Sequence, residues 1–317
     1  MKTLITVDTA YGSIQYECRE DYVVLASYRG ADRELFIPED VDGKPLVEIG
    51  KKAFLGCKQL QHIALPSGIM RIQDWAFAGC SGLEILMIPY REISIGQGIL
   101  KDCLRLIRIM PEGKDEICQP EKLHMHEGVP LHEDIPYLLA AVMNKLEAFY
   151  LFDLTTAGTE NWLVQWDTRM FTLLKRDDAE GFSKMLLCGE EDYGSRENNL
   201  DYYIEQRKRE KVRLCMLRLM HDIGLREPDR KYLQDYLKSH TKGEKSEETW
   251  KVVLEEHGDE KSFYQLLLDQ ECIHTHNFSA ILEDMGREHT EMKAFLMEQW
   301  EERRQKEAVF DTLSFDL

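Results

Sequence analysis

A period of 23 residues near the N-terminus limits what this chain can fold into more than any other feature. Cysteines recur at this spacing, and so do three sets of leucine or isoleucine positions. Equal spacing of one residue type stacks equivalent positions in successive coils, which bury ladders that no single coil could bury. The sequence therefore predicts a solenoid. Its columns are Cys57, Cys80 and Cys103; Leu60, Leu83 and Leu106; Ile63, Leu86 and Ile109; and Ile49, Ile72 and Ile95.

Each repeat carries its own local signals. The two best copies are IGKKAFLGCKQLQHIALP at residues 49–66 and IQDWAFAGCSGLEILMIP at residues 72–89. The alternation in LxxIxLP is typical of a short strand, which ends at the proline because proline cannot donate a ladder hydrogen bond. The AFxGC segment is typical of a turn whose Phe fills the interior and whose Gly permits positive φ. We therefore expect one parallel strand from each coil.

The cysteine column has two possible roles. A zinc site usually takes ligands about two to four residues apart, whereas these cysteines are separated by a whole coil. At equivalent stacked positions, they serve instead as small apolar side chains of a packing ladder. We interpret Cys57, Cys80 and Cys103 as core residues and the eight cysteines of the chain as reduced thiols.

The pattern IxxxAFxGCxxLxxIxLP resembles the BspA-type leucine-rich repeat, which occurs in many bacterial proteins, over about residues 10–111. The third copy departs from it, with Leu100 in place of Phe and Asp102 in place of Gly. The resemblance implies a short array of three to four coils with a degenerate last coil, and partner binding rather than chemistry. Alternating runs within residues 3–30 predict a β-hairpin that caps the open end.

The strand positions between the buried columns point the other way. If Ile63 and Leu65 face the interior, His62 and Ala64 face outward, and the spacing extends each into a row. An apolar row on a sheet face indicates either cover by another part of the chain, such as its helical domain, or a partner-binding surface. The candidate partner-binding residues are Phe36, His62, Ala64, Ile85, Met87, Arg108 and Met110.

The chain changes character after the repeats. The stretch from Pro111 to Pro136 contains four prolines, those two included, and no sustained periodicity, which indicates a linker at residues 112–132. Residues 133–317 then show apolar positions at three- and four-residue steps in about nine segments. Short helices joined by brief turns favour antiparallel pairs in an array similar to ankyrin-like or HEAT-like repeats. A single irregular bundle is the alternative.

The predicted fold is thus an α+β chain of two domains. Residues 1–111 form a leucine-rich-repeat β-solenoid with an N-terminal β cap, and residues 133–317 form an all-α domain of antiparallel helix pairs.

The net charge of −18 excludes some partners. Residues 1–130 hold 15 of the 40 basic and 19 of the 58 acidic side chains, so about −14 belongs to the rest. Such a charge repels phosphate backbones and anionic lipid, so we expect neither nucleic-acid nor membrane binding. The first apolar stretch breaks at Asp8, which is too early for a secretory signal, so we expect a cytoplasmic protein. Members of the resembled family that carry export signals are commonly surface or adhesion proteins.

No phosphate-binding loop, dinucleotide-binding, zinc-protease or serine-hydrolase motif is present in the sequence. We therefore predict a non-enzymatic protein–protein interaction module or scaffold without a cofactor, whose partner is another protein. One alternative is a metal-dependent enzyme or regulator in the helical half, with the weak candidate ligands Cys272, His274 and His276. The other is an architectural subunit of a larger assembly. The basic run RKREKVR at residues 207–213 is interpreted as a solvated helix face.

Overall fold

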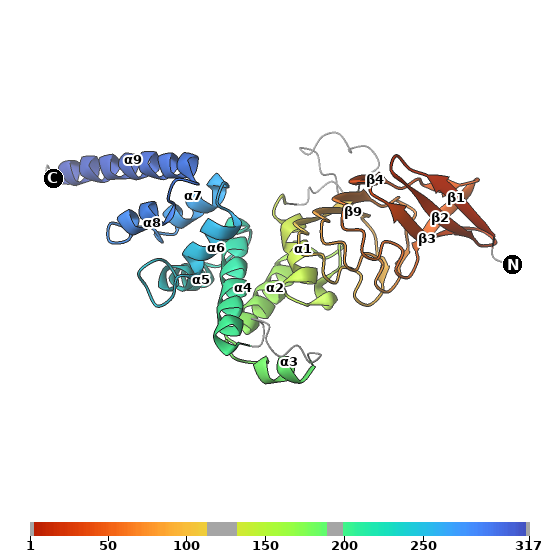
Figure 1. The fold of residues 1–317 in the computed structure, drawn as a ribbon, viewed down its shortest axis with the longest axis horizontal. Helices are drawn as coiled ribbons and strands as arrows, with labels where there is room; N and C mark the ends of the chain where they lie inside the picture. The colour runs from red at the N-terminus through yellow and green to blue at the C-terminus, as the bar shows by residue number, and fades with distance from the viewer. Residues whose placement is uncertain (1–2, 113–131, 189–198, 315–317) are drawn as a thin grey trace. The chain divides into compact units, whose positions relative to one another are not determined.

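The computed structural model describes residues 3–112, 132–188 and 199–314 (Figure 1). The chain divides into two compact units, Met1–Leu173 and Leu174–Leu317. The first holds the strands and the helices that follow them, and the second is helical. Nearly all of the predicted linker, residues 112–132, lies outside the described residues. The predicted domain limits, 1–111 and 133–317, therefore stay a prediction.

An antiparallel meander of three strands opens the first unit. The predicted hairpin corresponds to its second and third strands. A further strand precedes them and pairs with the second, so that Ile5 lies opposite Tyr16 and Val7 lies opposite Ile14. Its last strand pairs in parallel with the first strand of the coils, so the meander continues the solenoid sheet. The strands are β1 (Leu4–Asp8), β2 (Gly12–Cys18) and β3 (Val23–Gly30).

The coils that follow contribute parallel strands to two sheets, so the expectation of one strand per coil was wrong. The four-stranded sheet has the order β11-β9-β7-β4, and β6, β8 and β10 extend the cap sheet. The missed strands carry the Ile49, Ile72 and Ile95 column, and two of them are only two residues long. The elements are β4 (Glu34–Phe36), β5 (Asp40–Val41), β6 (Lys44–Ile49), β7 (His62–Ala64), β8 (Arg71–Ile72), β9 (Ile85–Pro89), β10 (Ser94–Ile95) and β11 (Arg108–Glu112).

Like side chains stack along the solenoid interior, as the period predicts. The rings of Phe54 and Phe77 are parallel with centroids 5.1 Å apart, and Tyr28 extends the stack at 5.6 Å from Phe54. The Cys80 thiol donates to the Phe54 carbonyl at 3.0 Å, and the next cysteine repeats this bond one coil on. Hydrogen bonding with Cys103 and burial raise the pKa of Cys80 to about 12. The interpretation as core residues of a packing ladder is confirmed for Cys80 and Cys103, whereas Cys57 is only half-buried.

The turn glycines of the repeat have the backbone conformation that the sequence suggests. Gly56 and Gly79 have φ angles of 71° and 72°, in the left-handed region. Asp102 occupies the equivalent position in the degenerate coil with φ of 60°. Aspartate is among the few residues with a side chain that tolerate this region, so the last coil keeps its turn without glycine.

A helix closes the C-terminal end of the solenoid. Helix α1 (Ile135–Asn144) packs against β11, and Asn144 Nδ2 donates to the Leu106 carbonyl at 2.9 Å. The 3-10 turn η2 (Phe149–Leu151) and helix α2 (Glu160–Leu174) follow. Buried tryptophans of α2 hold these elements, since Trp166 Nε1 donates to the Leu138 carbonyl at 3.0 Å. Helical residues that the sequence assigned to the second domain therefore belong to the compact unit of the solenoid.

The described part of the second unit is helical, as predicted, and the choice between an array and a single bundle stays a prediction. Helix α4 packs on α5 and α6, and α7 packs on α9. Gln234 of α5 donates to the Gln270 side chain after α7 at 2.8 Å, which joins consecutive pairs. The helices are α3 (Phe182–Cys188), α4 (Leu200–Met220), α5 (Glu227–Ser239), α6 (Glu248–Glu256), α7 (Lys261–Asp269), α8 (Phe278–Asp284) and α9 (Thr290–Ser314) (Figure 1).

A buried carboxylate ties the strands of the cap together. Asp32 is 4% exposed and accepts hydrogen bonds from the Thr9 hydroxyl, the Tyr11 backbone N–H and the Tyr28 hydroxyl. Burial raises the pKa of this carboxyl, but the hydrogen bonds outweigh burial and hold the pKa below its ordinary value. The ionised form of Asp32 therefore stabilises the cap.

The left-handed turns yield a first prediction. Substitution Gly79→Ala should lower the free energy of unfolding by about 1 kcal/mol, because an added Cβ forces φ of 72° on a residue that disfavours it. The cost is conformational, since the nearest atom to that Cβ lies 3.5 Å away. Urea unfolding measures the change, with Ser81→Ala as a neighbouring control. Equal stability of Gly79→Ala and the wild type would contradict the prediction.

A second prediction concerns Asp32. Substitution Asp32→Asn should cost about 1.5–3 kcal/mol at pH 7, because hydrogen bonds to a charged acceptor are lost. The folded-state pKa lies below the unfolded value near 3.8, so this stabilisation is present above that value and is lost as pH falls through the folded pKa. Thermal unfolding of both proteins should show a difference in stability that is constant from about pH 7 to 5 and becomes smaller in stronger acid. A difference that does not become smaller would argue against an ionised Asp32.

Candidate interaction surface

Strand register in the four-stranded sheet aligns the predicted outward residues into two rows. The outward positions of β4, β7, β9 and β11 lie directly opposite one another in the parallel ladders. These two sets are called the outer rows below. The mixed row is Glu34, His62, Ile85 and Arg108, and the apolar row is Phe36, Ala64, Met87 and Met110.

The residues between the two outer rows face the core. Leu35, Ile63, Leu86 and Ile109 are at most 4% exposed. Side chains alternate along a strand, so the outer rows lie on the opposite face of the sheet. The rows inferred from the 23-residue spacing thus exist as predicted, although their role in binding is a separate question.

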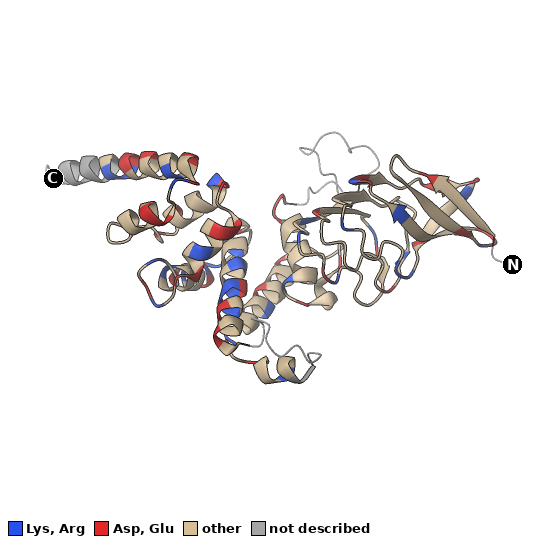
Figure 2. Ribbon diagram, in the orientation of Figure 1, with Lys and Arg blue, Asp and Glu red and all other residues tan. Residues whose placement is uncertain are grey.

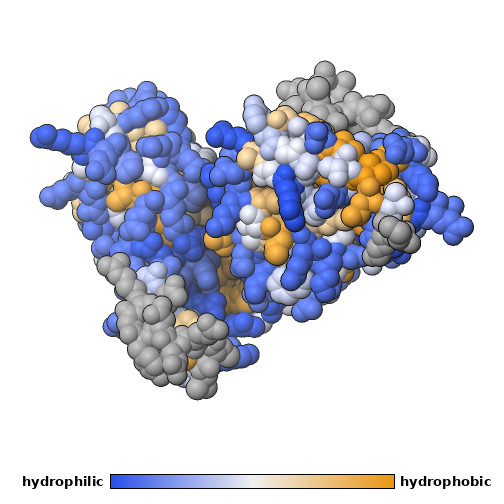
Figure 3. Space-filling view, turned by 45° about the vertical axis from the view of Figure 1, so that its right-hand side comes forward, coloured by the Kyte–Doolittle hydropathy of each residue, from blue (hydrophilic) through white to orange (hydrophobic). Residues whose placement is uncertain are grey.

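Exposure varies along the apolar row. Phe36 is 58% exposed, Met87 and Met110 are half-buried, and Ala64 is only 4% exposed. The smallest side chain of the row therefore lies between a large exposed ring and a methionine. Hydrophobic surface is visible on this unit next to the grey atoms at its upper edge (Figure 3). A solvent-exposed Phe in one row with two half-buried methionines is the kind of apolar surface that protein partners bind.

The mixed row carries opposite charges at its two ends. Glu34 lies at one end, with an oxygen 3.4 Å from His62 Nδ1. Arg108 lies at the other end, and its guanidinium is 5.6 Å from the ring centroid of Tyr137 on α1. A partner that crosses the strands would therefore meet an acidic and then a basic position.

The last coil exposes apolar residues that the sequence analysis missed. Leu104 is 79% exposed and Ile107 is 51% exposed. The earlier coils have polar residues at these register positions: Lys58 and Ser81 precede Leu104, and Gln61 and Glu84 precede Ile107. The change from polar to apolar residues at these two positions is visible in the sequence, but it lies outside the apolar columns that define the period.

The weak metal candidate is part of a helix connection. Cys272 is 1% exposed, and burial raises the pKa of its thiol to about 12. Asn277 organises the turn, since its Oδ1 accepts the His274 N–H and its Nδ2 donates to the Cys272 carbonyl, both at 2.9 Å. The rings of His274 and His276 are 5.8 Å apart. Within the described ranges, no group of three or more His, Cys, Asp or Glu side chains is placed to hold a metal ion.

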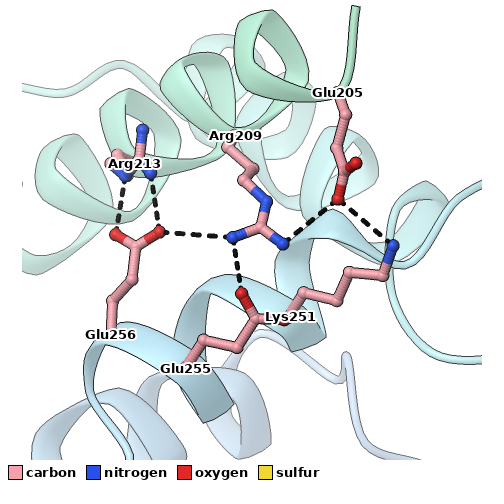
Figure 4. Close-up of polar contacts among 6 residues, drawn as sticks. All are labelled: Glu205, Arg209, Arg213, Lys251, Glu255 and Glu256. Carbon is pink, nitrogen blue, oxygen red and sulfur yellow. Dashed lines mark hydrogen bonds and ion pairs between the residues drawn. The ribbon is translucent and has the colours of Figure 1, made fainter. Parts of the chain in front are cut away.

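Acidic residues of the same unit neutralise the basic run at 207–213 (Figure 4). Arg209, whose side chain is 12% exposed, contacts Glu205 at 3.1 Å and Glu255 at 2.7 Å. Arg213 and Glu256 form a two-bond pair at 2.6 and 2.7 Å. Burial raises the pKa of Glu205, but the nearby cations Lys251 and Arg209 lower this pKa by more than burial raises it. The pKa of Glu205 therefore lies below its usual range. Arg209 and Arg213 therefore join α4 to α6, and basic and acidic residues both lie along α4 (Figure 2).

Comparisons with known proteins agree with the solenoid. Residues 39–119 match the family described as BspA type Leucine rich repeat region, in 6 copies. The chain is similar to the crystal structure of a leucine-rich repeat protein of T. pallidum, with 29% identity over 33% of this chain and 50% of that chain, at a TM-score of 0.31. A leucine-rich repeat protein from Bacteroides ovatus ATCC 8483 shows 28% identity over 33% of this chain and 29% of that chain, at a TM-score of 0.30.

The match spans half or less of each of these two solved chains. No curated protein matches this chain. No helix within residues 132–188 or 199–314 combines the length and the hydropathy that a membrane crossing requires.

A third prediction tests the α4–α6 network. Substitution Arg209→Met should lower the free energy of unfolding by about 1–3 kcal/mol, because it removes the cation that Glu205, Glu255 and Glu256 share. Arg207→Met is the matched control on the same helix, since the Arg207–Glu210 pair is about half exposed and should change stability by less than about 1 kcal/mol. Urea unfolding compares the two, and similar losses would contradict a special role for Arg209.

Proposed function

We propose that this chain, which contains a BspA-type leucine-rich repeat region, is a non-catalytic interaction module that binds another protein through the outer rows of its four-stranded sheet. One observation carries the proposal. An apolar row with Phe36 at 58% exposure runs across four strands beside a row of opposite charges.

Rigidity of the sheet supports this function. The residues behind the rows belong to a packed column, and parallel backbone ladders join every strand to its neighbour. The outer side chains are therefore held in place before a partner arrives. Binding to a preorganised surface costs less conformational entropy, so a modest patch can bind measurably.

The chemistry of the rows favours a protein partner. Phenylalanine, methionine and arginine are enriched in protein interfaces, and the net charge of −18 disfavours nucleic acid and anionic membrane. A complementary partner has an apolar strip to meet Phe36 and Met87, with a base near Glu34 and an acid near Arg108. The cytoplasmic location expected from the sequence remains part of this proposal.

The two alternative functions are not favoured. A metal-dependent site in the helical half has little support, because Cys272 is buried in a turn with its two histidines outside any ligand cluster among the described residues. A purely architectural role has no specific observation behind it. Absence of catalysis is likewise proposed from the family match and the lack of catalytic motifs.

A fourth prediction tests the surface. Affinity capture uses the full chain as wild type, as a Phe36→Glu, Met87→Glu variant, and as Met70→Glu. Met70 is 48% exposed and lies outside the outer rows, so it controls for adding a carboxylate to the solenoid. We expect one partner to be retained by the wild type and by Met70→Glu and to be lost by the row variant. Titration of the purified partner should then show at least about tenfold weaker binding to the row variant.

Circular dichroism and thermal unfolding establish beforehand that each variant is folded. Phe36 is largely exposed, so Phe36→Glu alone replaces the double variant if the half-buried Met87 proves necessary for folding. Equal affinity of the folded row variant and the wild type would refute the assignment of binding to the outer rows.

A further inference from the structure

Two pairs of aromatic rings connect helices of the second unit, one between α6 and α7 and one between α8 and α9. In α6 and α7, the rings of Trp250 and Tyr264 meet edge to face at 6.2 Å. In α8 and α9, the rings of Phe278 and Trp300 stack at 4.4 Å with an interplanar angle of 12°. Each aromatic pair joins the two helices of its own pair.

The two aromatic pairs differ in how deeply they are buried. Trp250 and Tyr264 are 1% and 0% exposed, and Trp250 Nε1 donates to the Asp284 carboxylate on α8 at 3.0 Å. Helix α8 therefore contacts the buried aromatic pair through Asp284. Phe278 and Trp300 are only half-buried, and Met297 beside them is 54% exposed. The side of α8 and α9 that carries Phe278, Met297 and Trp300 is therefore apolar and only partly covered, and it is called the outer face of these helices.

A groove open to solvent marks this face. Its volume is about 510 Å³. Stacked rings and an exposed methionine form its apolar part, while hydroxyls and two charges form its rim. The groove is lined by Thr275, Phe278, Ser279, Met297, Trp300, Glu301 and Arg304.

The charges at the rim make the face complementary to itself. Glu301 and Arg304 lie three residues apart on α9. Glu301 accepts a hydrogen bond from the Gln305 side chain at 3.5 Å, and no ion pair of either residue occurs in the described part of the chain. A two-fold axis through the face brings Glu301 of each copy toward Arg304 of the other. Closed two-fold contacts of this kind are the commonest in homo-oligomers.

We infer that the outer face of α8 and α9 is a homotypic interface, on which a second copy of this chain stacks by the same face. The second copy takes the place that the α8–α9 pair holds over Trp250. Its helices cover Phe278 and Trp300, and two reciprocal Glu301–Arg304 pairs set the alignment. This inference is independent of the proposed sheet-face function, because it involves only residues of the second unit.

The test is sedimentation equilibrium of the full chain over a range of concentrations. We expect a monomer–dimer equilibrium for the wild type. Glu301→Arg and Arg304→Glu should each weaken the dimer at least about tenfold, because every attractive contact becomes a like-charge contact. An equimolar mixture of the two variants should dimerise again, because both contacts of the mixed dimer then join opposite charges. One contact joins the two substituted residues, and the other joins the unchanged Glu301 to the unchanged Arg304.

Further variants complete the test. Met297→Glu places a carboxylate in the centre of the face and should abolish dimerisation without unfolding, because Met297 is exposed. Glu298→Arg makes the same charge reversal as Glu301→Arg at an exposed α9 position that does not line the groove, and it should leave the dimer unchanged. A monomeric wild type at all concentrations overturns the inference, as does failure of the two charge variants to associate when mixed.

Discussion

Stacking of like side chains between successive coils is the constraint on which the N-terminal unit depends. Phe54 stacks on Phe77, and the backbone N–H of Phe54 donates to the Ala76 carbonyl of the next coil at 2.7 Å. A single coil can neither bury its apolar side chains nor pair its backbone N–H and C=O groups on its own. The meander at one end and α1 at the other therefore complete the solenoid. Asp32 holds the strands of the meander together, and Asn144 joins α1 to the last coil.

The register that builds the core also arranges the surface. Once Ile63 and Leu86 stack inside, their neighbours on each strand must line up outside. This coupling explains why the rows proposed to bind a protein could be identified from spacing alone. The same register shows that Leu104 is an exception, because it is an exposed apolar residue at a position where the earlier coils have polar residues. Core and surface of the solenoid are thus two results of one repeat length.

The helical unit follows another principle, in which pairs of helices cover one another in succession. Between α4 and α6 the contact is ionic, with Arg209 among three carboxylates. Between α6 and α8 it includes Trp250 and its bond to Asp284. The inferred homotypic contact continues this order by one step, from Trp250 beneath α8 to Trp300 beneath a second copy. Together with the proposed sheet surface, this gives the chain one interface in each unit.

The sequence by itself determined the coil register, the inward cysteine and leucine columns, the outward rows and the approximate limits of the helices, because each depends on spacing along the chain. Tertiary structure alone decided the second sheet, since strands such as Arg71–Ile72 are too short to show alternation. It also decided that α1 packs on β11, that Arg209 is neutralised within its own unit and that Trp300 is left partly uncovered. These features depend on which distant residues meet, and spacing along the chain carries no information about such meetings.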